Sequence, residues 1–452
     1  MPVEIVEAIG DQREWGDREW FPPGAQLAIC LSGGKERLAD LTDDELLQVV
    51  VAARRQTSWA QARELAAIGE LTQRRVRDED DGDPDYRVLS ARESVAEEVA
   101  AALTVTGNAA TTLVHLAERL TGPLAATGDA LSAGRIDLAK ARVIVDTADG
   151  LPDQAVGDVE VVALAKASEQ TTGQLRRRVR RIAQRLAPEA VEERKRQAVR
   201  SRRLELFDTP VGTADLALCD LPAEDAHAIY NKITAAARGL KADGDTRALH
   251  CIRADLATQL LHGHQLPNAI RTPVVQPTSD PPADLPSSAI GDIGSPAGED
   301  LGVSGLAAMV DRRLGHVRGR VRPADLPAAI ARAAQRVRDE LASARDAACH
   351  GHDDEWDGRS GYRPPAALRR EVLARYPTCV FPTCNQPSHR CDLDHTVPWR
   401  PGITCRCNLA PLCRRHHRLK QTPGWHLHHL WPGLLLWVTP SGAWYIVRPD
   451  RQ

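Results

Sequence analysis

Cysteine and histidine residues gather in one short segment near the C-terminal end of the chain. Between Cys379 and Lys420 the sequence reads CVFPTCNQPSHRCDLDHTVPWRPGITCRCNLAPLCRRHHRLK. Cys379 and Cys384 form one close pair, and Cys413 and His416 form a second pair further along the segment. Two such pairs can supply the four ligands of a tetrahedral zinc site that leaves no position open for water. The spacing therefore predicts a structural zinc ion that staples a small fold.

Three further cysteines lie within the same segment. We interpret Cys391, Cys405 and Cys407 as non-ligands, although the run Cys405-Arg-Cys407 lies directly before Asn408 and could compete for zinc. Six of the ten cysteines follow residue 378, which favours metal binding by reduced thiols over a disulfide framework. The remaining histidines nearby are predicted to be exposed or strand residues rather than ligands: His389, His426, His428 and His429.

A second set of reactive residue types lies inside the loop that this Cys/His clamp closes. Asp394 and His395 end a short alternating stretch, which predicts a strand followed by a proline-rich turn. Asn408 precedes Pro411, and a proline suits the first turn of a helix that extends to Lys420.

The two adjacent histidines of that helix, His416 and His417, point about 100° apart, so they cannot easily serve one metal ion. One should face the zinc and the other a second site.

The order of these residues resembles the HNH endonuclease family, whose core is a strand hairpin and a helix around one divalent ion. The resemblance covers roughly Cys379 to Lys420. It implies that His395 is the general base and that Asn408 holds the loop that presents it. It also implies that Asp394 and His417 bind the catalytic ion, and it assigns the structural zinc to Cys379, Cys384, Cys413 and His416.

The chemistry of phosphodiester cleavage is consistent with these residue types. Cleavage needs a deprotonated water and positive charge where negative charge develops, and a histidine with a pKa near 6.5 can accept a proton at neutral pH. A hard ion such as Mg²⁺ suits the catalytic site, but an Asp/His pair also accepts Mn²⁺, Ni²⁺ or Zn²⁺, and the sequence does not choose among them. Taken singly, His395 could be a hairpin histidine bonded to a backbone carbonyl, and Asn408 could be an ordinary turn residue ahead of a helix.

The charge of the chain is distributed unevenly. Residues 361–452 contain thirteen Lys or Arg against four Asp or Glu, a balance of +9, whereas the whole chain carries −3. A basic domain of this kind attracts phosphates without regard to sequence, so DNA is the expected partner. The residues predicted to contact the DNA backbone are Arg400, Arg406, Arg414, Arg415, Arg418 and Lys420. The basic run from Arg176 to Arg203 is either a second DNA surface or a solvated helix face.

Upstream, the sequence predicts a mainly α-helical domain with a small β insertion. A capping box at Thr42–Glu45 starts a long helix over 42–76, and the acidic run that follows should be a loop. Helices are predicted at 91–103, 107–120, 124–131, 135–148, 155–166, 171–186, 222–238 and 244–262, with a hairpin of strands at 203–207 and 214–218.

No run of eighteen apolar residues exists and the N-terminus lacks a signal-peptide pattern, so a cytoplasmic protein without a membrane role is expected.

A second resemblance covers most of residues 40–265 and 361–447. The stretches ALSAGRIDLAKARVI, ADLALCDLPAEDA, DTRALHCIRADLATQLL and YRPPAALRREVLARYPTCVFPTC are similar to the 13E12-repeat proteins, which join a helical domain of undefined role to a C-terminal HNH module. We accordingly divide the chain into a helical domain over 1–265, a Pro/Ser/Gly-rich disordered or extended linker over 266–322, a connecting helix over 323–360 and an α+β, zinc-stapled ββα-metal domain over 361–452.

These patterns predict a divalent-metal-dependent HNH endonuclease that hydrolyses DNA and holds a structural zinc ion. The alternative is a non-catalytic zinc-containing DNA-binding or regulatory protein with a vestigial HNH site. A homo-oligomer formed through the helical domain is also left open.

Overall fold

The computed structural model describes residues 21–32, 37–80, 88–209, 211–263, 303–318, 321–343, 361–399 and 403–448. The chain divides into two compact units. The first combines Met1–Asp149 and Asp153–Ile182 with Ala297–Gln452, and the second comprises Gly150–Pro152 and Ala183–Pro296. These units cut the chain differently from the boundaries predicted at residues 265, 322 and 360.

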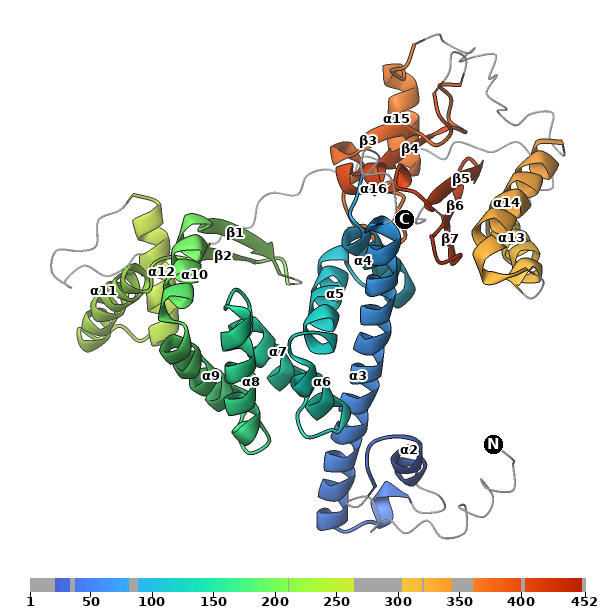
Figure 1. Ribbon diagram of the computed structural model, residues 1–452. Coiled ribbons are helices and arrows are strands. Elements are labelled where there is room, and N and C mark those ends of the chain that lie inside the picture. The colour runs from blue at the N-terminus through green and yellow to red at the C-terminus, as the bar shows by residue number, and fades with distance from the viewer. Residues whose placement is uncertain are drawn as a thin grey trace. The chain divides into compact units, whose positions relative to one another are not determined.

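The N-terminal part of the first unit is an array of helices that starts beside the long helix α3, Asp43–Asp80, and extends away from it (Figure 1). The predicted capping box is present, since Thr42 N donates to Glu45 Oε2 at 2.8 Å and Glu45 N donates to Thr42 Oγ1 at 3.4 Å. The helix continues past residue 76 into the acidic run, where Glu79 accepts a hydrogen bond from Ala91 N at 3.2 Å. The other helices are α2 (Ala25–Leu31), η2 (Leu38–Asp40), α4 (Ala91–Leu103), α5 (Gly107–Thr121), α6 (Ala125–Ser132), α7 (Leu138–Ala148), α8 (Asp153–Ala167) and α9 (Thr172–Leu186), within which the unit boundary after Ile182 falls.

The second unit contains the predicted β insertion. Strands β1 (Arg203–Asp208) and β2 (Ala214–Cys219) pair antiparallel, with Leu204 opposite Leu218. Around this hairpin in sequence lie α10 (Pro188–Arg200), α11 (Ala223–Ala242) and α12 (Leu249–Leu261). The last two helices share a small core that includes Leu240 and Ile252.

The C-terminal part of the first unit contains α15 (Ala366–Arg375) and η5 (Ser388–Arg390), followed by β3 (Asp392–His395), β4 (Leu409–Leu412) and α16 (Arg414–Lys420). β3 and β4 pair antiparallel, with His395 opposite Leu409. The prediction for Pro411 was wrong, because this residue lies in β4 rather than in the first turn of the helix. β4 pairs only with β3 in the described sheets, and an edge strand tolerates a residue without an N–H donor.

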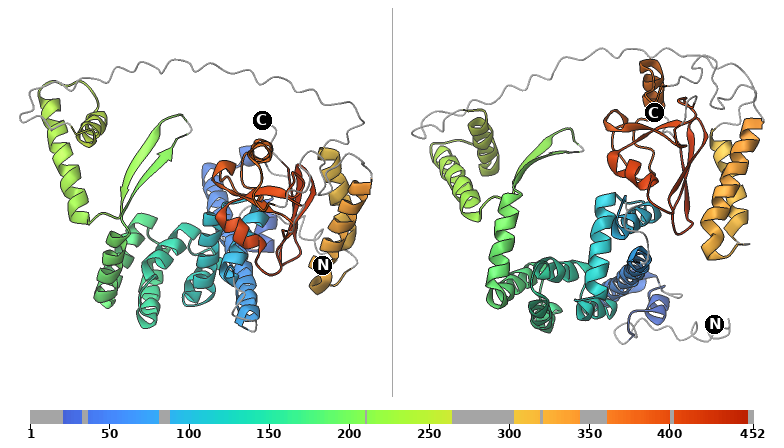
Figure 2. Two further views of the ribbon diagram at one scale, coloured as in Figure 1. Left: turned by 90° about the horizontal axis from the view of Figure 1, so that it is seen from above. Right: turned by 45° about the horizontal axis from the view of Figure 1, so that its top comes forward.

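A three-stranded antiparallel sheet closes this part of the chain, with β6 (Leu434–Val438) between β5 (His426–Trp431) and β7 (Trp444–Val447). Its residues alternate in the way a sheet buried on both faces requires. Leu435 and Trp437 join the core beneath β4, whereas Leu434 and Leu436 pack against α13 (Val303–Arg318) and α14 (Leu326–Ser343). Figure 2 shows this helix pair alongside the sheet.

Helix α13 corrects part of the predicted linker, because Val303–Arg318 is helical and its buried leucine and valine residues are core. Within the predicted connecting helix, α14 covers Leu326–Ser343, and residues 344–360 lie outside the described residues. The proline-rich stretch at 267–296 lies outside the described residues.

Helix α4 belongs to the core of the C-terminal part as well as to the helical array. Leu89 and Ala101 lie in the same buried cluster as Phe381 and Leu412, and Trp425 Nε1 donates to Ser94 Oγ at 2.9 Å. A capping box between Ser90 and Glu93 starts this helix.

Among the described residues no single helix is long and apolar enough to cross a membrane; α4 and α5 pass that test only as a pair bent by 115°.

Candidate metal centre and active site

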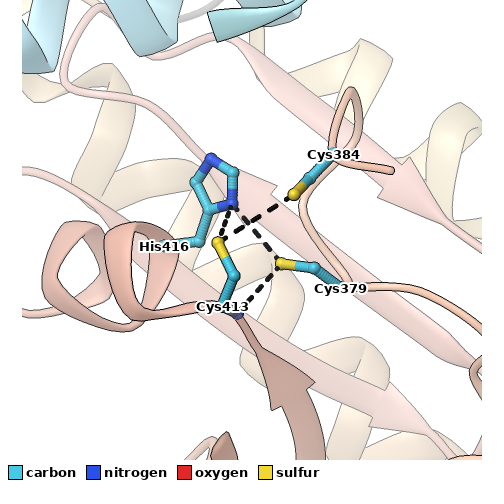
Figure 3. Close-up of side chains that lie close together, drawn as sticks. All are labelled: Cys379, Cys384, Cys413 and His416. Carbon is cyan, nitrogen blue, oxygen red and sulfur yellow. Dashed lines mark hydrogen bonds between the residues drawn. The ribbon is translucent and has the colours of Figure 1, made fainter. Parts of the chain in front are cut away.

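The four residues predicted to bind zinc come together at the start of α16 (Figure 3). One ligand atom from each of Cys379, Cys384, Cys413 and His416 lies within 4.8 Å of all the others. His416 Nδ1 lies 3.4 Å from Cys379 Sγ and 3.2 Å from Cys413 Sγ, and the sulfurs of Cys384 and Cys413 are 3.9 Å apart. Three thiolates and one imidazole form a Cys₃His set that could hold a metal ion such as zinc.

Local backbone structure brings the two pairs together. A turn in which Cys384 N donates to Phe381 O at 3.1 Å places Cys379 and Cys384 side by side. Cys413 is the residue that precedes α16, and its N–H donates to Cys379 Sγ at 3.3 Å. His416 follows within the first turn of the helix, so its ring returns to the same sulfurs.

The electrostatics of the cluster favour a bound cation. Burial alone would lower the pKa of His416, but hydrogen bonds with the surrounding thiols and with Glu97 raise this pKa to about 11. Hydrogen bonds with Cys379 and Cys384 lower the pKa of the Cys413 thiol. The cluster therefore stabilises both a thiolate and positive charge, which are the two components of a metal–thiolate centre.

The other three cysteines of the segment are not part of this cluster. Cys391 Sγ donates to Gln386 O at 3.8 Å and to Pro387 O at 3.5 Å. The sulfurs of Cys405 and Cys407 lie 2.9 Å from each other in the turn before β4. The structure thus groups the cysteines as the spacing predicted.

The second set of residues surrounds a cavity of about 500 Å³ between the β3–β4 hairpin, α16 and β5. His417 Nε2 lies 3.3 Å from Asp394 Oδ1, and His417 Nδ1 lies 3.4 Å from Asp392 Oδ2. His416 and His417 therefore face different sites, as their adjacency on the helix predicted. Lys420 also pairs with Asp394 Oδ2, so the cavity floor contains one carboxylate, one imidazole and one ammonium group.

These contacts set the charge of the pair. Burial alone would raise the pKa of Asp394, but hydrogen bonds from His417 and Lys420 lower it overall. The hydrogen bond with Asp394 raises the pKa of His417. An ionised carboxylate beside an imidazole could hold a divalent ion.

His395 lines the same cavity from the end of β3. Its Nε2 lies 3.0 Å from Thr404 Oγ1, while that hydroxyl donates its own proton to Gly361 O at 3.0 Å. The ring nitrogen must therefore be the donor in the first contact, which leaves Nδ1 without a proton. Nδ1 is buried and has no partner among the described residues. Burial lowers the pKa of His395, which favours the neutral ring that a general base requires.

Asn408 ties together the ends of the loop between β3 and β4. Its Oδ1 accepts from Val397 N at 2.8 Å and from Thr396 Oγ1 at 2.9 Å, and its Nδ2 donates to Ile403 O at 3.0 Å. The side chain is buried. Asn408 thus holds the backbone directly after His395 on one side and the backbone before Thr404 on the other.

The predicted DNA-contacting residues have different surroundings. Arg414 is exposed at the start of α16, with 87% of its side chain accessible. Arg415 pairs with Glu97 and Arg418 donates to Val88 O, so both point toward the helical array. Lys420 lies in the cavity and donates to His395 O at 2.5 Å. Arg406 lies 3.9 Å from Glu371, and Arg400 lies outside the described residues.

Several residues around these sites were not found by sequence reasoning. Thr404 and Thr396 carry no motif signal, since isolated threonines are common in loops. Tyr362 lies before α15, yet its ring centroid is 5.2 Å from that of His395. Glu97 belongs to a helix more than three hundred residues earlier, and only the tertiary structure brings it to His416.

Comparisons with known proteins place the chain in a family. A family model described as a domain of unknown function, DUF222, matches residues 52–271. Uncharacterized protein Rv3776 of Mycobacterium tuberculosis is 31% identical over 450 residues, which span 94% of this chain and 83% of that protein. Uncharacterized proteins Rv2100 and MT2160 of the same species are each 38% identical over 102 residues, or 22% of this chain and 18% of theirs. No solved structure matches. The chain therefore belongs to the DUF222 family.

Proposed function

We propose that this protein is a divalent-metal-dependent endonuclease of the HNH type that hydrolyses DNA phosphodiester bonds. The observation that carries the proposal is the convergence of His395, Asp394 and His417 on one cavity of about 500 Å³. A strand hairpin and a short helix supply all three residues, which is the arrangement that the order of the motif predicts.

The residues of this chain have distinct roles in the proposed reaction. His395 Nδ1 accepts a proton from the attacking water, because Thr404 retains the other proton of the ring at Nε2. The water oxygen then forms a bond to phosphorus while the bond to the leaving 3′ oxygen breaks. Asn408 keeps the loop in place so that the ring of His395 stays directed into the cavity.

Asp394 and His417 are the residues that would hold the catalytic ion. When bound there, a hard divalent ion supplies positive charge to the scissile phosphate and the leaving oxygen. Lys420 pairs with Asp394 and also bonds to the backbone of His395. It therefore fixes the distance between the ligand pair and the base.

The Cys₃His cluster is proposed to hold a structural zinc ion. Cys413 precedes α16 and His416 lies within it, so a zinc bound here would fix the helix that carries His417 and Lys420. The β3–β4 hairpin and α16 are short elements, and a metal staple there would add stability to them.

Supercoiled plasmid DNA tests the proposal directly. The purified chain should nick or linearise the plasmid with Mg²⁺ or Mn²⁺ and should not do so in EDTA. The His395→Ala variant should not cleave the plasmid with either metal ion. DNA binding in EDTA without cleavage under any divalent ion would support a non-catalytic DNA-binding protein instead.

A further inference from the structure

We propose that Glu97, in the part of the chain that matches the domain of unknown function, is a positioning residue of the metal centre. Its carboxylate holds the outer ring nitrogen of His416, so that helix α4 completes the Cys₃His site. The inference rests on the proposed zinc ion but not on nuclease activity. It gives the helical region a defined chemical task, namely to orient a metal ligand of the C-terminal module.

The two ring nitrogens of His416 face different groups. Nδ1 is directed at the sulfurs of Cys379 and Cys413, at 3.4 and 3.2 Å. Nε2 lies 3.2 Å from Glu97 Oε2. A metal bound at Nδ1 requires the ring proton to be on Nε2, where the carboxylate accepts it. Glu97 therefore selects the tautomer that can bind metal.

The surroundings of Glu97 fix its contact with His416 in the folded protein. Only 1% of the Glu97 residue is exposed, and a buried carboxylate is costly unless it has partners that carry hydrogen-bond donors or positive charge. Those partners are His416 and Arg415, both on α16. On its face the His416 ring stacks against Phe381 at a centroid distance of 4.0 Å and an angle of 13°. Face and edge of the ring are thus both fixed.

The neighbouring acid, Glu98, has a different task on the same helix. It is also buried, but it accepts from Ser441 N at 3.1 Å and pairs with Arg75 at 3.4 Å. Glu98 therefore fastens α4 to the turn between β6 and β7 without touching the metal cluster. Consecutive helix residues point about 100° apart, which explains why two adjacent acids reach separate targets.

Two consequences follow from this arrangement. The carboxylate should increase zinc affinity, because it orients His416 and makes its coordinating nitrogen more basic. By thermodynamic reciprocity, zinc binding should also strengthen the docking of α4 onto the C-terminal module. The metal centre and the helical array would then assemble as one structural unit.

The test compares Glu97→Gln with the matched control Glu98→Gln in the full-length, zinc-loaded chain. Zinc affinity and release are measured by competition with the chromogenic chelator 4-(2-pyridylazo)resorcinol. Glu97→Gln should lower zinc affinity about 10- to 100-fold, whereas Glu98→Gln should stay within about threefold of wild type. Equal affinities for Glu97→Gln and wild type would overturn the proposal. Equal losses in both variants would also overturn it, because helix docking rather than the carboxylate would then matter.

A second measurement needs no variant. In zinc-loaded wild-type protein with ¹⁵N-labelled histidine, the Nε2–H of His416 should give a resonance that exchanges slowly with water. An unprotonated or rapidly exchanging Nε2 would contradict the proposal even if Glu97→Gln did not fold. Wild-type protein that binds no zinc would instead overturn the metal centre itself, and a zinc-loaded chain without nuclease activity would leave the role of Glu97 standing.

Discussion

His395 Nε2 and Thr404 Oγ1 lie 3.0 Å apart, and this contact decides which nitrogen of the histidine is the base. Thr404 gives its only hydroxyl proton to Gly361 O, so it can only accept from the ring. A residue nine positions after His395 thereby presets the ring for proton transfer from Nδ1. The same contact holds the ring against rotation out of the cavity.

Replacing either partner should therefore slow cleavage, but to different extents. His395→Ala should reduce plasmid cleavage by at least about 100-fold with DNA affinity nearly unchanged, because a general base acts in the transition state rather than on a phosphate. Thr404→Val should lower kcat by roughly tenfold or more, since the ring loses its preset tautomer. Thr422→Val, which removes another hydroxyl bonded to backbone in the same module, is the matched control. Wild-type rates for Thr404→Val would rule out the tautomer argument.

Asn408 offers a separate test of how the loop is held. Asn408→Ala removes one donor and two acceptor contacts to backbone and side chain, and leaving buried groups unpaired costs about 1–3 kcal/mol. The loop between β3 and β4 should then become a preferred site of limited proteolysis, and cleavage of DNA should fall with it. A variant that resists protease like wild type while losing activity would place Asn408 in the chemistry instead.

The zinc prediction concerns composition as well as stability. Dialysed wild-type protein should contain one zinc ion per chain by elemental analysis, and Cys384→Ser or Cys413→Ser should lose it together with a large part of the thermal stability of the C-terminal module. Cys405→Ser is the matched control, because this thiol lies beside that of Cys407 and outside the cluster. Folded wild-type protein without zinc would show that the cluster is not a zinc site.

Local sequence patterns were sufficient for the metal cluster and for the separation of His416 from His417. Both follow from short-range spacing on a turn and a helix, which tertiary structure did not alter. The helices of the N-terminal array likewise followed from caps and apolar periodicity. Pro411 misled the prediction, since a proline at a helix start and one in an edge strand look the same in sequence.

Long-range packing could not be predicted in this way. Arg415 and Arg418 are basic residues beside a predicted nuclease site, which favoured phosphate contacts. Their actual neighbours are Glu97 and Val88 O, over three hundred residues away in the sequence. Likewise, the amphipathic pattern of α13 gave no sign that its partner would be the outer face of the β5–β6–β7 sheet.

The positions of these arginines change the expected salt dependence of DNA binding. Arg414 is the exposed arginine at the start of α16, so Arg414→Gln should reduce the slope of log affinity against log salt by about 0.9. Arg415→Gln and Arg418→Gln should leave that slope nearly unchanged and instead weaken the docking of α4, visible as a lower melting temperature. If the slope of log affinity against log salt changes only when the arginines from Arg176 to Arg181 are neutralised, the DNA contact lies on α9 instead.

Acid should destabilise the C-terminal module through His428, which lies on β5 beside the cavity. Burial, together with the nearby charge of Arg338, lowers the pKa of this ring to about 4, and its Nε2 is buried without a partner among the described residues. In the unfolded chain the pKa returns to about 6.5. Between these two values the unfolded state binds more protons, so the free energy of unfolding falls as the pH falls. The contribution is fully present above about pH 6.5 and is lost toward pH 4, with a limit of roughly 3 kcal/mol.

Urea denaturation of wild type and His428→Leu at pH 7.5, 6.0 and 5.0 measures this contribution. The difference in the free energy of unfolding should shift in favour of the variant as the pH falls, because titrations common to both proteins cancel in the comparison. His389→Leu changes an exposed ring in the same module and serves as the matched control. A difference that stays constant from pH 7.5 to 5.0 would mean that His428 takes up its proton in the folded protein as readily as in the unfolded chain.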